Sequence, residues 1–407
     1  MHARQALEGV RILEFGRVVT GPVASEMLAF YGATVVKIET LQNIDALRST
    51  PPYKDNVPGV DRSSYFTKYN VNKLGMGLNL NKPGGLDLFK KLVAWCDVLL
   101  ECNGPGVAAK FGVTYEKMKE INPDLIMIHT SQFGQQGPLA RFKSYGAQST
   151  ALAGFYDFTT YPDGTVTTPF GAYTDLIAYQ YVALAIMGAL HYREHTGKGS
   201  YIDHSQVEAG ILFLTPAVLE WSTNKQLYSS DGNLNPPGSP HGIYRCEGDD
   251  RWCSISVFND EQWLSLCRTA GHTEWIDDPR FETPLARRKN REELDSLIKE
   301  WTGQHTAEYV MYELQARGVP AGLISRNVDI FRDPQLRTRD YFVGLEHPEI
   351  GYHTHERPPH IFSETPASLV SSGPCLGQHN EIICKEILGL TDDEIGELII
   401  DGTLEQS

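Results

Sequence analysis

A carboxylate at the start of an apolar helix is the most reactive feature that the sequence offers. Asp175 ends the segment Gly171-Ala-Tyr-Thr-Asp and precedes residues 176–190, which carry no charge. The free N–H groups at the start of such a helix orient a carboxylate, and apolar surroundings strip it of water. Both conditions suit a nucleophile that attacks a carbonyl carbon and forms a covalent intermediate. Asp is also a favoured N-cap residue, and on this segment alone capping is the commoner explanation.

Two further groups could take part in such a reaction. The segment Ser131-Gln-Phe-Gly-Gln-Gln-Gly-Pro, which contains Gln135, could present backbone N–H groups to a thioester oxygen, although a tight loop explains it equally well. Lys110 and Lys143 could bind phosphate groups, although solvated surface lysines are the simpler explanation for each.

The signatures of several other enzyme classes are absent. No G-x-G-x-x-G follows the first predicted strand, and no G-x-x-x-x-G-K-[ST] occurs. His353, His355, Glu356 and His360 resemble metal ligands in their spacing, but a solvated Pro-rich loop explains them better. We therefore predict no metal site.

The elements that must position these groups alternate between strand and helix, which predicts a parallel sheet with helices on both faces. The predicted strands are residues 10–15, 34–39, 98–101 and 125–129, and the predicted helices are residues 23–30, 84–96 and 115–121. Ligands bind such sheets beyond the carboxyl ends of the strands. This rule selects the loops at residues 17–22, 102–106 and 130–137.

Length and composition limit the possible functions. A chain of 407 residues predicts more than one domain, and its formal net charge of −15 argues against nucleic acid or an anionic membrane as partner. Seven cysteines without a C-x-x-C pair favour a reduced, cytoplasmic protein. We expect no signal peptide, and the apolar residues 176–190 predict a buried core helix too short to span a membrane.

Segments along nearly the whole chain, in order, resemble the family III CoA-transferases, which include formyl-CoA transferase and carnitine CoA-transferase. The likeness is carried by Leu7-Glu-Gly-Val-Arg-Ile-Leu-Glu-Phe, Gly32-Ala-Thr-Val-Val-Lys-Ile-Glu, Asn72-Lys, Leu78-Asn-Leu, Gly104-Pro-Gly, Phe133-Gly-Gln-Gln-Gly-Pro, Tyr173-Thr-Asp, Thr196-Gly-Lys-Gly, Asn259-Asp-x-Gln-Trp, Gly318-Val-Pro-Ala-Gly and Leu376-Gly-Gln-His. The resemblance implies an α/β fold with a Rossmann-like parallel sheet in a large domain and a smaller α+β domain. We expect the large domain at residues 1–220 and 336–407, and the small domain at residues 221–335.

The resemblance assigns the catalytic role to Asp175, which overrides the N-cap interpretation. It implies that the carboxylate attacks an acyl-CoA thioester and passes through an aspartyl anhydride and an aspartyl-CoA thioester. Both intermediates hydrolyse unless water is excluded. In relatives a glycine-rich loop closes over the site, and residues 233–242, with Gly232 and Gly238, are the candidate here.

The same resemblance implies that coenzyme A is a substrate and that no cofactor is tightly bound. Its implied contacts are Val19, Thr20, Leu78, Asn81, Cys102, Asn103, Gly104, Lys110 and Lys143. Thr40 and Asn81 are neutral where formyl-CoA transferase is basic, and Arg48 and Lys82 are candidate replacements. Two interlocked chains are expected, either as a homodimer or with a paralogous subunit.

The acceptor acid is the most open part of the prediction. Arg17 or Arg141 could pair with a second carboxylate of the acceptor, which favours succinyl-CoA as donor and acids such as benzylsuccinate. A CoA-ester racemase or epimerase is a second hypothesis, but its His-Asp pair would fall at Tyr145-Gly-Ala-Gln-Ser, which offers neither group. A low-activity partner subunit of a hetero-oligomer is a third hypothesis.

Overall fold

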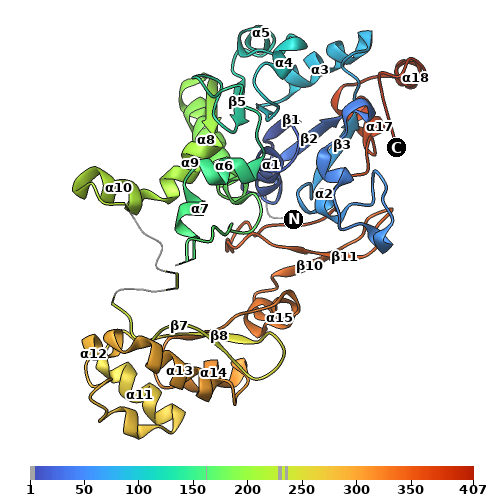
Figure 1. Cartoon of the computed structure of the whole chain (residues 1–407). Coiled ribbons are helices and arrows are strands. Elements are labelled where there is room, and N and C mark those ends of the chain that lie inside the picture. Colours follow the sequence, from blue (N-terminus) through green and yellow to red (C-terminus); the bar gives the residue numbers. More distant parts are fainter. Residues whose placement is uncertain (1–4, 162, 228–231, 234–236) are drawn as a thin grey trace. The chain divides into compact units, whose positions relative to one another are not determined.

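The chain divides into two compact units (Figure 1). The computed structural model describes residues 5–161, 163–227, 232–233 and 237–407. The first unit comprises Met1–Phe158, Thr168–Tyr228 and Arg337–Ser407, and the second comprises Thr159–Thr167 and Ser229–Leu336. Each unit has its own sheet and its own hydrophobic core.

A six-stranded sheet forms the centre of the first unit. Its strands are β1 (Arg11–Phe15), β2 (Thr34–Glu39), β3 (Lys73–Gly77), β4 (Val98–Glu101), β5 (Ile126–Ser131) and β6 (Ser200–Ser205). They lie in the order β3-β2-β1-β4-β5-β6, and every neighbouring pair is parallel. The predicted α/β parallel sheet is therefore confirmed. The strand order reverses between β1 and β4, so their carboxyl ends flank the crevice where sheets of this kind bind ligands.

Helices cover both faces of this sheet because its strands are apolar on both sides. The helices of the first unit are α1 (Thr20–Ala29), α2 (Ser64–Lys68), α3 (Pro83–Trp95), α4 (Val107–Lys110), α5 (Tyr115–Ile121), α6 (Gly146–Leu152), α7 (Phe155–Phe158), α8 (Tyr173–Thr196), α9 (Gln206–Phe213), α10 (Thr215–Asn224), α17 (Asn380–Ile382) and α18 (Asp392–Ile400). In β1, Ile12 packs with Leu28 of α1 and Ile186 of α8, whereas the next residue, Leu13, packs with Phe89 of α3.

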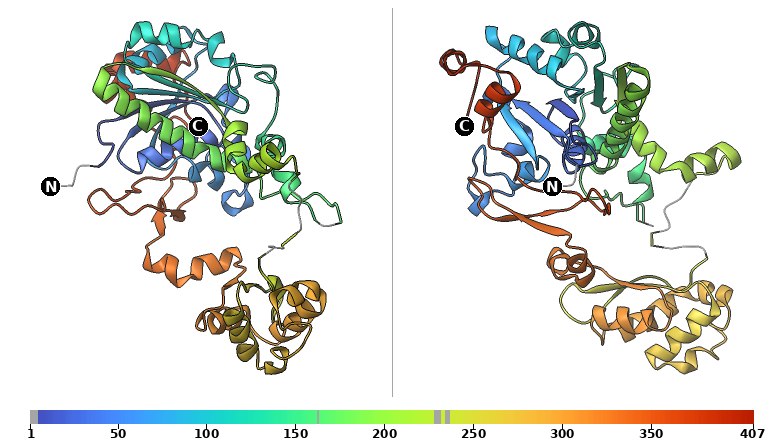
Figure 2. Two further views of the ribbon diagram at one scale, coloured as in Figure 1. Left: turned by 90° about the vertical axis from the view of Figure 1, so that its left-hand side faces the viewer. Right: turned by 180° about the vertical axis from the view of Figure 1, so that it is seen from behind.

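Helix α8 is longer than its sequence pattern predicts. It runs for 24 residues, lies along the sheet (Figure 2, left) and contacts α1 and β5. By length and composition alone it could cross a membrane, but 44% of its most apolar 18-residue window is buried inside the protein. The predicted helix over residues 176–190 was too short, because the polar last turns continue the same helix to Thr196.

The second unit is built on a small antiparallel sheet. Its strands are β7 (His241–Arg245), β8 (Trp252–Ser256) and β9 (Ala321–Leu323), and its helices are α11 (Asp260–Ala270), α12 (Pro284–Lys289), α13 (Arg291–Thr302), α14 (Ala307–Gln315) and α15 (Asn327–Arg332); α16 (Pro334–Thr338) spans the boundary between the units. Trp263 is at the core, and the buried guanidinium of Arg287 lies 5.0 Å from its ring.

The last segment of the first unit begins with an antiparallel hairpin. It consists of β10 (Phe342–Leu345) and β11 (His353–Glu356). His355 is buried in this hairpin and its lowered pKa, about 3, is caused mainly by burial. The sequence-based description of this histidine as part of a solvated loop was therefore wrong.

Candidate active site

Asp175 lies in the first turn of α8, three residues after its N-cap, Ala172. It is therefore not the N-cap residue. Its side chain is 7% exposed, and among the described residues no group donates a hydrogen bond to the carboxylate. Burial is the cause that raises its pKa, from 3.8 to about 7. A carboxylate without donors or a paired cation keeps its lone pairs free for attack.

The start of helix α6 approaches this carboxylate very closely. A Cβ atom at Gly146 would lie 2.5 Å from Asp175 Oδ2, so only glycine fits without a shift of the helices. The two helices are joined by the hydroxyl groups of Thr150 and Thr174, 3.2 Å apart, and Thr174 also donates to the carbonyl of Gly146 at 3.3 Å. These contacts fix the position of Asp175 on a rigid pair of helices.

The loop after β1 is held by a buried chain of charges. Val18 has a φ of 73°, which is unfavourable for a β-branched residue. Its N–H donates to both carboxylate oxygens of Asp45 at 3.1 Å. Lys37 binds Asp45 at 3.3 Å and Glu14 at 2.8 Å, and the charged groups of both ion pairs are buried. The network therefore supplies the support that this strained loop requires.

Thr20 and Val19 follow in this loop and are both buried. The Thr20 hydroxyl accepts a hydrogen bond of 2.8 Å from Gln206 Nε2 at the start of α9. The loop after β1 is thus joined to α9, and α9 packs on α8.

Cys102 and Asn103 extend from β4 on the other side of the strand-order reversal. Cys102 Sγ fills the space beside Gly16 and Gly21, so a side chain at either glycine would overlap it. Burial raises the pKa of this thiol, so it is a packing group and not a thiolate nucleophile. Asn103 Nδ2 donates to the carbonyl of Phe15 at 3.0 Å. Gly104 is exposed next to them.

The predicted basic groups face solvent. Lys110 ends helix α4, Lys143 and Arg141 precede α6, and all three are exposed with no ion pair within the described part of the chain. Arg17 donates to Asn43 Oδ1 at 2.6 Å.

The loop after β5 is held by Gln135. The N–H of Gln135 donates to Asp203 of β6 at 2.9 Å, so this loop is fixed to the edge strand.

Arg48 cannot replace the basic residue that formyl-CoA transferase has at the position of Thr40. Arg48 is 1% exposed and binds Glu39 at 2.7 Å and Asp61 at 2.5 Å. It therefore has no donor free for a phosphate, and the suggestion that it replaces a basic residue at Thr40 was wrong. Two implied CoA contacts differ in burial: Leu78 is buried in the core, whereas Asn81 is exposed, as is Lys82.

The predicted lid belongs to the second unit. Gly232 is exposed, and a Cβ atom at Gly238 would lie 3.1 Å from His241 Cβ and 3.2 Å from Phe258 Cε1, both in the same unit. Residues 228–231 and 234–236 lie outside the described residues. The lid assignment remains a prediction.

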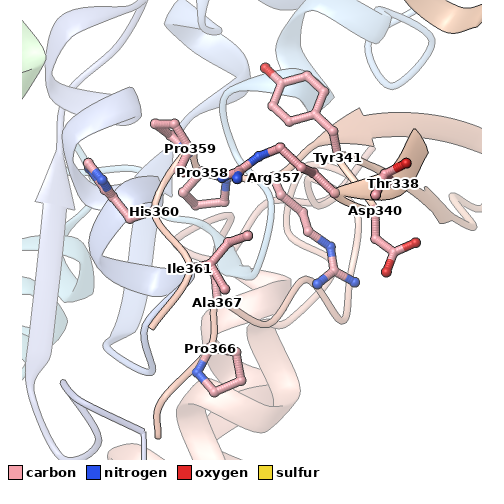
Figure 3. Close-up of a pocket in the computed structure, with 11 residues that line it drawn as sticks. Thr338, Asp340, Tyr341, Arg357, Pro358, Pro359, His360, Ile361, Pro366 and Ala367 are labelled. Atoms are coloured by element: carbon pink, nitrogen blue, oxygen red, sulfur yellow. Dashed lines mark hydrogen bonds between the residues drawn. The ribbon is translucent and has the colours of Figure 1, made fainter. Parts of the chain in front are cut away.

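Two hollows lie in the first unit, and neither includes Asp175. One of about 410 Å³ is lined by residues such as Tyr341, Arg357 and His360 (Figure 3) and includes no predicted site residue. The other, of about 200 Å³, lies beyond β5 and is lined in part by Gln135 and His129.

One possible metal-binding group was missed in the sequence. His191, Glu194 and His195 place their ligand atoms within 4.8 Å of one another at the exposed end of α8. Their i, i+3, i+4 spacing is the signal that could have revealed it.

Comparison with known proteins identifies the class to which this site belongs. Residues 7–380 match CoA-transferase family III, and the chain belongs to this family. It is 32% identical to succinyl-CoA–D-citramalate CoA-transferase of Chloroflexus aurantiacus, over 96% of each chain. It is 30% identical to succinyl-CoA:glutarate CoA-transferase of Homo sapiens, over 100% of this chain and 91% of the other. A crystal structure of a CAIB/BAIF family protein from Brucella suis superimposes with a TM-score of 0.87 at 29% identity, covering 94% of this chain and 100% of that one.

Proposed function

We propose that this CoA-transferase uses Asp175 as a covalent carrier of CoA between two acids. The Asp175 carboxylate attacks the carbonyl carbon of the donor thioester, which gives an acyl-aspartyl anhydride and CoA thiolate. The thiolate attacks the aspartyl carbonyl carbon and releases the donor acid, leaving an aspartyl-CoA thioester. The acceptor carboxylate repeats these two steps in reverse order, so CoA leaves on the acceptor and Asp175 is restored.

The single observation that carries this proposal is the environment of Asp175. It is a buried carboxylate with a pKa raised to about 7 and no donor or cation partner within the described residues. A buried carboxylate with a purely structural role normally accepts hydrogen bonds or forms an ion pair. Gly146 beside it provides no proton-transfer group, which favours acyl transfer over the racemase hypothesis.

The loops at the strand-order reversal are the proposed binding site for the CoA moiety. Val19 and Thr20 follow β1, and Cys102, Asn103 and Gly104 follow β4, so both loops lie beyond carboxyl ends of neighbouring strands. Exposed Lys110 and Lys143 are the proposed cations for the phosphate groups.

We propose succinyl-CoA as donor and a dicarboxylic acid as acceptor. The names of the two relatives support this choice, because citramalate and glutarate are both dicarboxylates. Arg17 uses one guanidinium nitrogen on Asn43, and its remaining N–H groups could receive the second carboxylate of the acceptor. Benzylsuccinate fits the same chemistry.

A second copy of the chain is the proposed partner, in the interlocked arrangement that the family resemblance implies. Helices α9 and α10 expose large apolar side chains, among them Leu212, Phe213, Leu219 and Trp221, the last two 57% and 53% exposed. Large exposed apolar side chains that gather on consecutive helices often mark an interface. Light scattering of the purified chain should give the mass of a dimer.

Trapping of the intermediate tests the mechanism directly. The protein is mixed with succinyl-CoA, treated with borohydride and digested, and the peptide that contains Asp175 is weighed. We expect reduction at Asp175 in the wild type and none in Asp175→Ala. Reduction at another residue, or full turnover by Asp175→Ala, would contradict the proposal.

The pH dependence gives a second test. Because the nucleophile must be ionised, kcat/KM should fall about tenfold per pH unit below about pH 7 and level off above it. A profile that remains flat down to pH 5 would show that Asp175 is not titrating in the free enzyme.

A further inference from the structure

Residues 403–405 form a short antiparallel partner for the end of β3. Leu404 pairs with Leu78, and the N–H of Glu405 donates to the carbonyl of Gly77 at 3.0 Å. A side chain at Gly77 would overlap the carbonyl of Glu405, so glycine permits this approach. Figure 1 shows the C-terminal end of the chain beside β3 and α17. Glu405 is thereby brought to the carboxyl ends of β2 and β3.

The Glu405 carboxylate joins two loops that are far apart in sequence. Its Oε2 accepts hydrogen bonds from Thr40 Oγ1 at 2.7 Å and from the Leu41 N–H at 2.6 Å. Its Oε1 accepts a hydrogen bond from Asn79 Nδ2 at 2.9 Å. Asn79 Oδ1 in turn accepts from the N–H of Asn81 at 3.0 Å. Bonds to an ionised acceptor are stronger than neutral ones, so this relay fixes the backbone after both strands.

No cation compensates this carboxylate within the described residues, whose ion pairs do not include Glu405. It therefore places a negative charge near exposed Asn81, to which it is linked through Asn79 and which the family resemblance implies as a CoA contact. Charge alone would make Glu405 unfavourable for a ligand that carries several phosphate charges. Its three donors suggest a different role, in which the carboxylate organises the loops that the ligand meets.

We infer that Glu405 is a positioning residue for CoA binding, an inference that rests on the proposed function. It holds residues 40–41 and 78–81 in the shape that receives the CoA moiety, and this effect outweighs its repulsion of the phosphates. The two effects predict opposite results when the charge is removed. Loss of positioning weakens the binding of acyl-CoA, whereas loss of repulsion strengthens it.

Glu405→Gln separates these effects, because glutamine has one acceptor oxygen and cannot serve all three donors. We expect the KM for succinyl-CoA to rise about tenfold, the change expected when one charge-assisted hydrogen bond is lost, with kcat changed less than about twofold. Gln406→Ala is the matched control, since Gln406 is exposed and makes no side-chain hydrogen bond in the described structure. Its KM should equal that of the wild type.

Asn79→Ala breaks the relay without touching the charge of Glu405. It should also raise the KM for succinyl-CoA, and the KM of the double variant should be little higher than that of either single variant, because both act through one relay.

An unchanged or lowered KM in Glu405→Gln would overturn the inference, as would additive effects of the two substitutions on log KM. If Glu405→Gln fails to fold, the Asn79→Ala result decides alone: an unchanged KM overturns the inference. A wild-type chain without CoA exchange would instead refute the proposed function.

Discussion

Two buried carboxylates of the first unit have opposite electrostatic environments. Glu14 on β1 is fully buried and binds Lys37 and Lys73, each at 2.8 Å, as well as the Ser25 hydroxyl. Burial alone would raise its pKa, but the charges and hydrogen bonds of the two lysines outweigh burial and lower it to about 2. Asp175 is similarly buried but has no such partners, and its pKa rises to about 7.

The difference shows that charged partners, and not burial alone, decide the direction in which the pKa of a buried carboxylate shifts. Glu14 is neutralised by cations from β2 and β3, so it supports the sheet and the loop above it. Asp175 is left with unused lone pairs at the start of a helix, where attack on a carbonyl carbon is possible. Three variants test this distinction, and one of them does so in two ways.

Asp175→Asn should have the largest effect. Removing the nucleophile should lower kcat for CoA exchange at least about 10³-fold, while the isosteric amide keeps the fold. Initial rates with succinyl-CoA and a dicarboxylic acid measure the loss, and Glu14→Gln, if folded, serves as a comparison with a carboxylate outside the chemistry. Activity within tenfold of the wild type would remove Asp175 from the mechanism.

Glu14→Gln should mainly destabilise the protein. It leaves Lys37 and Lys73 buried without their shared carboxylate, a change that typically costs about 3–5 kcal/mol in the free energy of unfolding. Because the pKa of Glu14 is lowered, its contribution is present above pH 4.5 and is lost as the pH falls toward about 2. Urea unfolding at pH 7 measures the loss, and a loss below 1 kcal/mol would show that the network is not structural.

Asp175→Asn should have the opposite effect on stability. The raised pKa of Asp175 means that its ionisation destabilises the folded state increasingly from pH 3.8 to about 7. Asparagine removes this penalty, so the variant should be about 4 kcal/mol more stable than the wild type at pH 8 and equal to it at pH 4. Urea unfolding at both pH values tests the sign, and equal stability at pH 8 would mean that the carboxylate has an unseen partner.

Gly146→Ala should have the smallest of these effects. Its methyl group would lie 2.5 Å from Asp175 Oδ2, so α6 or the carboxylate must shift. A displacement on this scale should reduce kcat/KM about tenfold or more without unfolding the protein. Gly188→Ala on α8 is a suitable control, because a Cβ there meets no atom within 4 Å. Equal activities of the two variants would show that the approach of α6 is not important.

The central strands were predictable because they are apolar on both faces, whereas the two edge strands were not. β3 contains Lys73, Gly75 and Gly77, and β6 is mostly polar and ends in Asp203-His-Ser, so neither has the composition of a buried parallel strand. Both are recognised only from their pairing with β2 and β5. Arg48 was misassigned for a related reason, since its acceptors, on Glu39, Val60, Asp61 and Pro374, lie in other segments of the chain.

The sequence by itself determined the alternating α/β pattern, the place of Asp175 before an apolar helix and the family to which the chain belongs. These are local or collinear properties, which the order of residues expresses directly. Only the tertiary structure decided that Gly146 lies against Asp175 and that Glu405 reaches Thr40 and Asn79. Such contacts join segments from different elements. The packing of the chain, and not its local pattern, sets the distances between the groups in contact. Those distances in turn set the charge that each group carries.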